Sequence, residues 1–469
     1  MRLPVALLAL VGLAPAAIAA DLPKEKPNIV ILLADDLGWN AVGYHGGFAH
    51  TPHIDSIAKR GVELDRSYVC PMCSPTRAGL MTGRYPIRFG MGRSVVRPWS
   101  MTGLPAEETT LPQLLGEAGY ANRAMFGKWH MGHLDPKWHP LAHGFTHYEG
   151  CYNGAADYFT RVRDGQPDWH VDYDDRDPEG YTTDLIADAA AAFIRDRGKD
   201  RSPFFCYVAF TAVHEPAQAT QKYLDQYDNL KGEKRILAAQ DTCMDDGIGR
   251  ILDAIDHAGV ARRTLVWFFS DNGGLRKIPG NNAPLRGGKL TCYEGGIRTP
   301  AAVYWPGVIE GGRRLEAQVA NVDLLPTLVH AAGGTVKTNK PLDGIDVFDE
   351  LTGGPAVRRD VYDFTGQDGL DKEIISINSA DGWKLIVAGP DIRRPGGIDP
   401  KTHKVELFHL SEDLLEKTDL AGKEPARVKE LGGKLIAFRA SEPEGALPTQ
   451  NAKPEGFVPP KNWHNGPKN

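Results

Sequence analysis

The chain has 469 residues, of which 42% are hydrophobic and 24% charged, and its formal net charge is −6. That length exceeds the usual size of a single hydrophobic core, so we expect one large domain and a smaller one. Because acidic and basic residues are mixed along the chain, the composition argues against a polybasic surface for nucleic acid.

The first twenty residues have the pattern of a secretory signal. Arg2 precedes an apolar run that reaches Ile18, and small residues follow up to Ala20. A membrane anchor is the alternative, but the run is short and contains two prolines. We therefore expect an exported protein with no membrane partner, periplasmic or secreted. The absence of any Asn-x-Ser/Thr sequence favours a bacterial source.

Buried strands alternate with helices over the first two thirds of the chain. Apolar runs predict strands, and segments with a helical apolar period predict helices between them. The strands are expected at 28–34, 123–126, 204–210, 265–269 and 301–305, and the helices at 51–61, 110–119, 184–197, 234–257 and 323–332. This alternation predicts an α/β fold, a mostly parallel sheet with helices on both faces.

After Gly333 the pattern changes to that of a smaller, antiparallel unit. Alternating strands are expected at 382–388 and 404–410, and a helix at 425–439. The predicted organisation is a signal at 1–20, a catalytic α/β domain at 21–335, and a small C-terminal α+β subdomain with a tail at 336–469.

Short oxygen-bearing side chains follow two of the predicted strands. Asp35 and Asp36 come after the first strand, and Asp271 and Asn272 come after the strand at 265–269. Each pair could simply cap the turn that follows it. If both pairs lie on the carboxyl edge of one sheet, three carboxylates meet and need a cation. Oxygen ligands without histidine favour Ca²⁺ or Mg²⁺.

Cys73 lies at the predicted start of a helix that contains Pro75 in its first turn. A helix N-terminus suits an anion, and Arg77 one turn later can reach back toward it. Cys73 could be a small buried core residue or a thiolate nucleophile with a lowered pKa. A third interpretation comes from the sequence around it.

Cationic side chains gather at the same predicted edge. A lysine and a histidine follow the strand at 123–126, a histidine follows the strand at 204–210, and a lysine lies in a Gly-rich loop. Each could be an ordinary surface or structural residue, but together they suit a tetrahedral oxyanion. The members are Arg77, Lys128, His130, His214 and Lys289.

Six sequence motifs resemble those of the type I, formylglycine-dependent sulfatases, and they follow one another as in that family. They are 33–39 (LADDLGW), 73–77 (CSPTR), 82–84 (TGR), 126–132 (FGKWHMG), 270–274 (SDNGG) and 284–289 (PLRGGK). The segments 213–216 and 280–282 resemble the arylsulfatase B branch, which removes 4-O-sulfate from N-acetylgalactosamine. The chain departs from that branch in its shorter C-terminal part and in lacking a clear set of paired cysteines.

The resemblance implies an alkaline-phosphatase-like fold and a converted cysteine. A maturation enzyme would oxidise Cys73 to formylglycine (3-oxoalanine), and the hydrate of that aldehyde would be the nucleophile. The resemblance also implies Ca²⁺, and it assigns its ligands to Asp35, Asp36, Asp271, Asn272 and the residue derived from Cys73.

The resemblance to the sulfatases further implies roles for the cationic residues. Arg77 would steady the hydrate, and Lys128 and Lys289 would hold the sulfate. His130 would take the proton that lets sulfate depart, and His214 would face the leaving alcohol.

The resulting expectation is an exported hydrolase of sulfated carbohydrates, active in degrading sulfated polysaccharides. The expected substrate carries 4-O-sulfated N-acetylgalactosamine or galactose. The alternatives are an arylsulfatase of broad specificity, a phosphomonoester or phosphonate hydrolase on the same fold, and a non-catalytic carbohydrate-binding relative.

Overall fold

The computed structural model describes residues 25–200, 202–444, 446 and 452–466. The expected signal at 1–20 therefore lies outside the described residues. Within the described part of the chain, no helix combines the length and apolar character needed to cross a bilayer.

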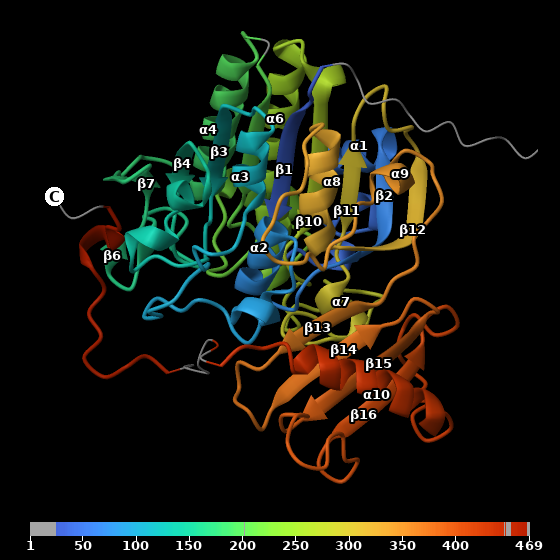
Figure 1. Ribbon diagram of the computed structural model, residues 1–469. Helices are drawn as coiled ribbons and strands as arrows, with labels where there is room; N and C mark the ends of the chain where they lie inside the picture. The colour runs from blue at the N-terminus through green and yellow to red at the C-terminus, as the bar shows by residue number, and fades with distance from the viewer. Residues whose placement is uncertain (1–24, 201, 445, 447–451, 467–469) are drawn as a thin grey trace, which may run out of the picture.

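A ten-stranded sheet forms the middle of the large domain (Figure 1). Its order is β12-β2-β11-β10-β1-β9-β3-β4-β7-β8, and β1 pairs in parallel with both β9 and β10. The strands are β1 (Asn28–Ala34), β2 (Val62–Tyr68), β3 (Asn122–Gly127), β4 (His147–Gly150), β7 (His170–Val171), β8 (Asp174–Asp175), β9 (Phe204–Ala209), β10 (Thr264–Ser270), β11 (Ala301–Tyr304) and β12 (Arg313–Ala320). The expected mostly parallel sheet is confirmed. The antiparallel pairs are those of β11 with β2 and β10, and those of β7 with β4 and β8.

Helices cover both faces of this sheet, as the sequence predicts. Along β1, Ile29, Ile31 and Leu33 pack into one core, and Val30 and Leu32 pack into the other. The first face carries α2 (Cys73–Thr82), α3 (Leu111–Glu117), α8 (Leu324–Ala331) and α9 (Phe348–Leu351). The second carries α1 (Pro52–Arg60), α4 (Thr182–Arg197), α5 (Gln221–Leu224) and α6 (Gly232–His257). Because β1 is buried on both faces, it reads as a continuous apolar run.

A four-stranded antiparallel sheet forms the C-terminal subdomain, below the large sheet in Figure 1. Its strands are β13 (Val361–Thr365), β14 (Glu373–Asn378), β15 (Trp383–Gly389) and β16 (Lys404–His409). The last helix, α10 (Pro425–Arg439), packs on this sheet through Leu431 and Leu435. The expected small antiparallel sheet with one helix is present, with two strands more than the sequence suggested.

A buried ion-pair network joins the subdomain to the large domain. Lys384 of β15 lies 2.8 Å from Glu294 at the start of α7 (Glu294–Ile297) and 2.8 Å from Glu416. Neither Lys384 nor Glu294 is exposed. Since α7 follows the Gly-rich loop that carries Lys289, the network holds that loop against the subdomain.

The last described segment, 452–466, returns to the large domain. Its Trp463 is fully buried and donates from Nε1 to the carbonyl of Arg163, at a distance of 3.0 Å. Arg163 belongs to a two-stranded hairpin of β5 (Val162–Arg163) and β6 (Gln166–Pro167). The segment 452–466 is thus a strap that packs against this hairpin (Figure 1).

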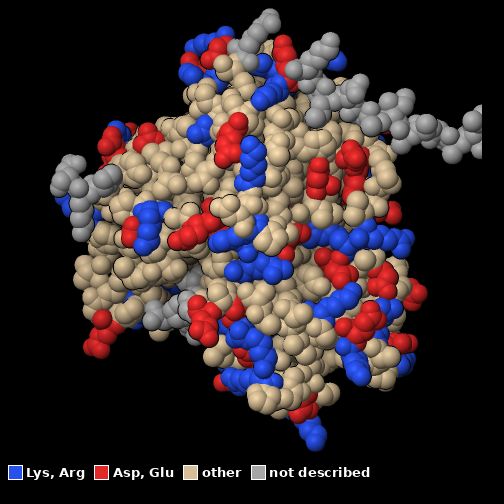
Figure 2. Space-filling model, viewed as in Figure 1, with Lys and Arg blue, Asp and Glu red and all other residues tan. Residues whose placement is uncertain are grey.

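Charged residues of both signs alternate over the molecular face that Figure 2 draws. That face carries no continuous basic surface, in agreement with the mixed charges of the sequence.

Candidate active site

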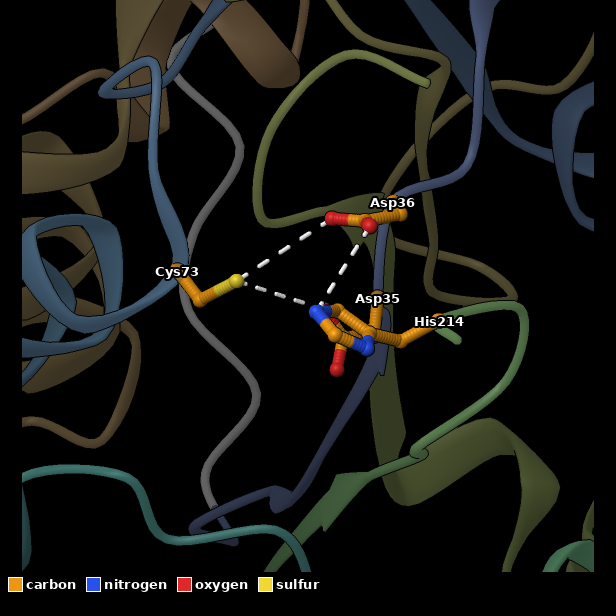
Figure 3. A group of neighbouring side chains, drawn as sticks. All are labelled: Asp35, Asp36, Cys73 and His214. Atoms are coloured by element: carbon orange, nitrogen blue, oxygen red, sulfur yellow. Dashed lines mark hydrogen bonds and ion pairs between the residues drawn. The ribbon is translucent and has the colours of Figure 1, made fainter. Parts of the chain in front are cut away.

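Cys73 is the first residue of α2 and lies at the carboxyl edge of the large sheet (Figure 3). The residue is only 1% exposed, and its thiol donates to Asp35 Oδ1 at 3.4 Å. The ammonium group of Lys289 lies 3.5 Å from the sulfur. Burial and the nearby carboxylate of Asp271 raise the pKa of the Cys73 thiol above its ordinary value, so the neutral thiol is favoured.

The two acidic pairs meet next to Cys73, as the strand ends predict. Residues Ala34 and Ser270 are partners in the β1–β10 ladder, which brings the following residues together. The backbone amide of Asp36 donates to Asp271 Oδ1 at 3.2 Å. Asp36 has a φ of 63°, a left-handed conformation that a short polar residue tolerates. Asp35, Asp36, Asp271 and Asn272 are all buried.

This group of oxygen atoms suits a hard cation. Asn272 donates from Nδ2 to Asp36 Oδ1 at 2.7 Å, while its Oδ1 is buried with no hydrogen-bond partner in the described part of the chain. Burial raises the pKa of Asp35 to about 7, and repulsion from the neighbouring carboxylate of Asp271 adds to that shift. A divalent ion would relieve this repulsion and use the orphaned amide oxygen, so the residues fit Ca²⁺.

Each carboxylate also has its own cationic partner. Arg77 donates two hydrogen bonds to Asp271 Oδ2, from Nε at 3.0 Å and from Nη2 at 2.8 Å. Lys128 pairs with Asp35, and Lys289 lies 2.6 Å from Asp36 Oδ1. Three negative and three positive side chains therefore balance within the site. A bound Ca²⁺ would leave a surplus of two positive charges, which suits a sulfate group.

Lys289 also determines the ionisation of Asp36. Burial alone would raise the pKa of that carboxyl, but the ammonium of Lys289 lowers it below its ordinary value. Asp36 therefore stays ionised.

His130 follows β3 and lines the pocket above Cys73. Its Nε2 lies 3.0 Å from the carbonyl of Val96, and its Nδ1 is buried without a partner among the described residues. Burial and the charge of Lys128 lower its pKa well below the ordinary histidine value, so the ring is neutral. A Cβ on Gly154 would come within 2.4 Å of this ring, so only glycine fits there.

His214 follows β9 and approaches the site from the opposite side to Cys73 (Figure 3). Its Nε2 lies 3.8 Å from Asp36 Oδ2, and its Nδ1 lies 2.7 Å from the carbonyl of Glu215. Burial and the charge of Lys289 lower its pKa to about 3, although Asp36 opposes that shift. The bond to the carbonyl places the proton of the neutral ring on Nδ1 and leaves Nε2 toward Asp36.

A pocket opens above these residues. Cys73, His130, His214 and Lys289 line it together with residues that the sequence did not single out. The additional residues are Val95, Val96, Arg97, Pro98, Gly154, Ala155, Arg163, Leu290 and Gln367. They come from loops, the β5–β6 hairpin and the subdomain, and no motif in the sequence marks them as neighbours.

All ten residues singled out by the sequence thus lie at one edge of the large sheet. Cys73 is adjacent to Asp35, Asp36 and Lys289, and Arg77 lies behind Asp271 and Lys128. The six cysteines are buried thiols, and none forms a disulfide.

Comparisons with known proteins agree with this geometry. A family model described as Sulfatase matches residues 27–334. Arylsulfatase J of Mus musculus is 30% identical over 95% of this chain and 79% of its own length. N-acetylgalactosamine-6-sulfatase of Rattus norvegicus is 35% identical over 74% of this chain and 70% of its own.

A solved structure, described as Ps i-CgsB in complex with k-i-k-neocarrahexaose, matches with a TM-score of 0.82 and 28% identity. The match covers 91% of this chain and 96% of that one. The relatives include 6-sulfatases and arylsulfatase J, so they do not specifically support the 4-sulfatase branch that segments 213–216 and 280–282 suggested.

Proposed function

Because the chain belongs to the sulfatase family and is a sulfuric ester hydrolase, we propose that it removes sulfate from a sulfated carbohydrate through a formylglycine made from Cys73. Cys73 carries this proposal, because it begins α2 beside Lys289 and the acidic cluster and lines the pocket. A maturation enzyme of the exporting cell would carry out the conversion.

The names of the relatives support a galactose-type sugar. One relative is named for N-acetylgalactosamine 6-sulfate, and a matching structure holds a neocarrahexaose. The sulfate position, 4-O or 6-O, is decided by assaying the two isomers of N-acetylgalactosamine sulfate side by side.

The chain's own residues would hold the sulfate group and its reacting neighbours. The formylglycine hydrate would supply the hydroxyl that attacks sulfur. Asp35, Asp36, Asp271 and Asn272 would hold Ca²⁺, which would make that hydroxyl more acidic. Lys289 and Lys128 would turn from their carboxylates toward the sulfate oxygens. Arg77, fixed by Asp271 and by the carbonyl of Lys128, would hold the position of residue 73.

Two histidines would carry out the proton transfers of the reaction. His130 would accept a proton at Nδ1, which has no hydrogen-bond partner among the described residues, when sulfate departs from residue 73. His214 would face the oxygen of the leaving sugar with Nε2. It would take up a proton on that nitrogen in the substrate complex and pass it to the departing oxygen. An incoming sulfate ester is anionic, which counteracts the charge of Lys289 that lowers the pKa of His214.

A matched pair of esters tests the proposal. The wild-type enzyme, expressed with a maturation enzyme and supplied with Ca²⁺, should release sulfate from N-acetylgalactosamine sulfate faster than phosphate from the equivalent phosphate ester. Cys73→Ala should abolish the reaction. Faster phosphate release would favour the phosphomonoester hydrolase, and sulfate release by Cys73→Ala would exclude a nucleophile at residue 73.

A further inference from the structure

Asn282 lies between the two chain segments that build the sulfate site, although it is not among the described residues that line the pocket. One segment is 271–274, which follows β10 and begins with two of the predicted Ca²⁺ ligands. The other is the Gly-rich loop at 284–289, which ends in Lys289. Asn282 is only 6% exposed, so its polar side chain needs hydrogen-bond partners within the protein.

The Asn282 side chain binds the backbone of both segments. Its Oδ1 accepts from the amide of Gly274 at 2.8 Å, and its Nδ2 donates to the carbonyl of Gly274 at 2.9 Å. The same Nδ2 donates to the carbonyl of Gly287 at 3.2 Å. The side-chain amide of one residue thus uses its acceptor and both of its donors to join the two segments.

The backbone of Lys289 is bound to the same glycine. Its amide donates to the carbonyl of Gly274 at 3.1 Å, so that carbonyl accepts from both Lys289 and Asn282. The ammonium of Lys289 lies 2.6 Å from Asp36 Oδ1 and 3.5 Å from Cys73 Sγ. The position of this ammonium therefore depends on how the loop is attached to Gly274.

The packing around Asn282 is too tight for a displaced loop. A Cβ added to Gly288 would come within 2.6 Å of Asn282 Nδ2 and 2.6 Å of the Gly274 carbonyl oxygen, so a larger residue there would push the loop away. The local turn does not need the side chain, because Leu285 closes it by donating to the backbone carbonyl of Asn282 at 2.9 Å. The side chain of Asn282 therefore serves the contact between the two segments.

We propose that Asn282 is a positioning residue for Lys289, and that its amide fixes the place from which Lys289 binds the sulfate. This inference rests on the proposed function, because it takes Lys289 as a sulfate-binding group. Asn282 acts through the backbone of the loop and is not itself a catalytic residue. A misplacement of about 1 Å at a binding group can cost about 100-fold in rate, so the contact bears on catalysis as well as on stability.

A double-mutant cycle separates positioning from folding. The measurement is kcat/KM for nitrophenyl sulfate, per folded molecule that carries formylglycine, in wild type, Asn282→Ala, Lys289→Met and the double variant. Asn282→Ala should lower kcat/KM by about 10- to 100-fold when Lys289 is present, and by less than about twofold in the Lys289→Met background. A merely structural role would give equal losses in both backgrounds, and equal losses would overturn the inference.

A matched control is Asn28→Ala, which removes another buried asparagine side chain. Asn28 Oδ1 accepts from the amide of Phe204 at 3.3 Å, and its Nδ2 donates to Thr264 Oγ1 at 3.2 Å. Asn28 begins β1, at the end of the sheet opposite to Cys73. Its removal should leave kcat/KM of the folded enzyme unchanged. A loss as large as that of Asn282→Ala would overturn the inference, because the effect would not be particular to the Lys289 loop.

Gly288→Ala keeps the test decisive if Asn282→Ala does not fold. The added methyl group would push the loop away from Asn282 Nδ2 while Asn282 itself is retained. This variant should show the same loss of kcat/KM, and the loss should again depend on Lys289. A kcat/KM equal to that of wild type would show that displacing the loop has no consequence, and would overturn the inference.

Amide hydrogen exchange tests the inference without any activity. In the peptide that covers 284–290, Asn282→Ala should raise the exchange rate of the Lys289 amide by at least about tenfold, whereas Asn28→Ala should not change it. An unchanged rate in Asn282→Ala would overturn the inference even in an active enzyme. If wild-type protein releases no sulfate, the proposed function fails, and the exchange rates alone decide whether Asn282 fixes the Lys289 loop.

Discussion

Replacing His214 by alanine should affect substrates according to how poor their leaving group is. His214 lines the pocket, and a carbonyl 2.7 Å from Nδ1 fixes its ring with Nε2 toward the reaction site. A sugar alkoxide is a strong base and needs a proton as it departs, whereas nitrophenolate is stable as an anion. General acid catalysis typically contributes ~10²–10⁴-fold. We expect His214→Ala to lower kcat/KM by about that factor for a sulfated sugar and by less than about tenfold for nitrophenyl sulfate.

The assay is kcat/KM for wild-type and His214→Ala enzymes across aryl sulfates of graded phenol pKa, with a sulfated sugar as the final member. The nearest ionic contact of His214 is 3.8 Å long, so its removal should leave the fold intact, which thermal unfolding can check. Lys128→Met serves as the comparison, because loss of a sulfate-binding lysine should harm every member alike. An equal loss across the series for His214→Ala would refute the acid role and indicate that His214 binds the sulfate.

Three further substitutions test the ion site, the subdomain interface and a buried acid. Asp271→Asn should abolish calorimetric Ca²⁺ binding, because it removes a carboxylate of the cluster; unchanged affinity would exclude the assigned site. Lys384→Met should cost about 3–5 kcal/mol in the free energy of unfolding by urea, since it leaves Glu294 and Glu416 buried without their cation; a cost below about 1 kcal/mol would contradict the network. Burial raises the pKa of Asp241 well above 3.8, and neither of its oxygens has a partner among the described residues. The contribution of Asp241 to wild-type stability should therefore fall as the pH rises above about 4, and Asp241→Asn should gain increasingly over wild type from there to pH 7; a pH-independent difference would argue against a raised pKa.

The sequence predicts the central sheet and the acidic edge because both have local patterns. β1, β9 and β10 are buried on both faces and appear as apolar runs, and the polar pairs follow directly where those runs end. β2 and β12 were not predicted, because their sequences mix charged and apolar residues and the two strands are only partly buried. Their place in the sheet depends on pairing with distant strands.

The loop residues that line the pocket above Cys73 could not be predicted from the sequence for a similar reason. Arg97 lies in a loop after the Cys73 helix, Arg163 in a two-residue strand, and Gln367 after β13 of the subdomain. The fold and the strap around Trp463 bring these positions together. No local sequence pattern predicts such long-range contacts. The motifs indicated the sulfatase chemistry but suggested a branch that the relatives do not specifically support.

The central claim is that Cys73 acts only after conversion to formylglycine. The tryptic peptide 67–77 contains both Cys70 and Cys73, so one mass spectrum reports the state of both. In preparations made with different amounts of maturation enzyme, the rate of sulfate release should rise in proportion to the fraction of peptide with an aldehyde at residue 73, while Cys70 remains a thiol. Full activity in a preparation whose Cys73 is entirely an unmodified thiol would contradict the account.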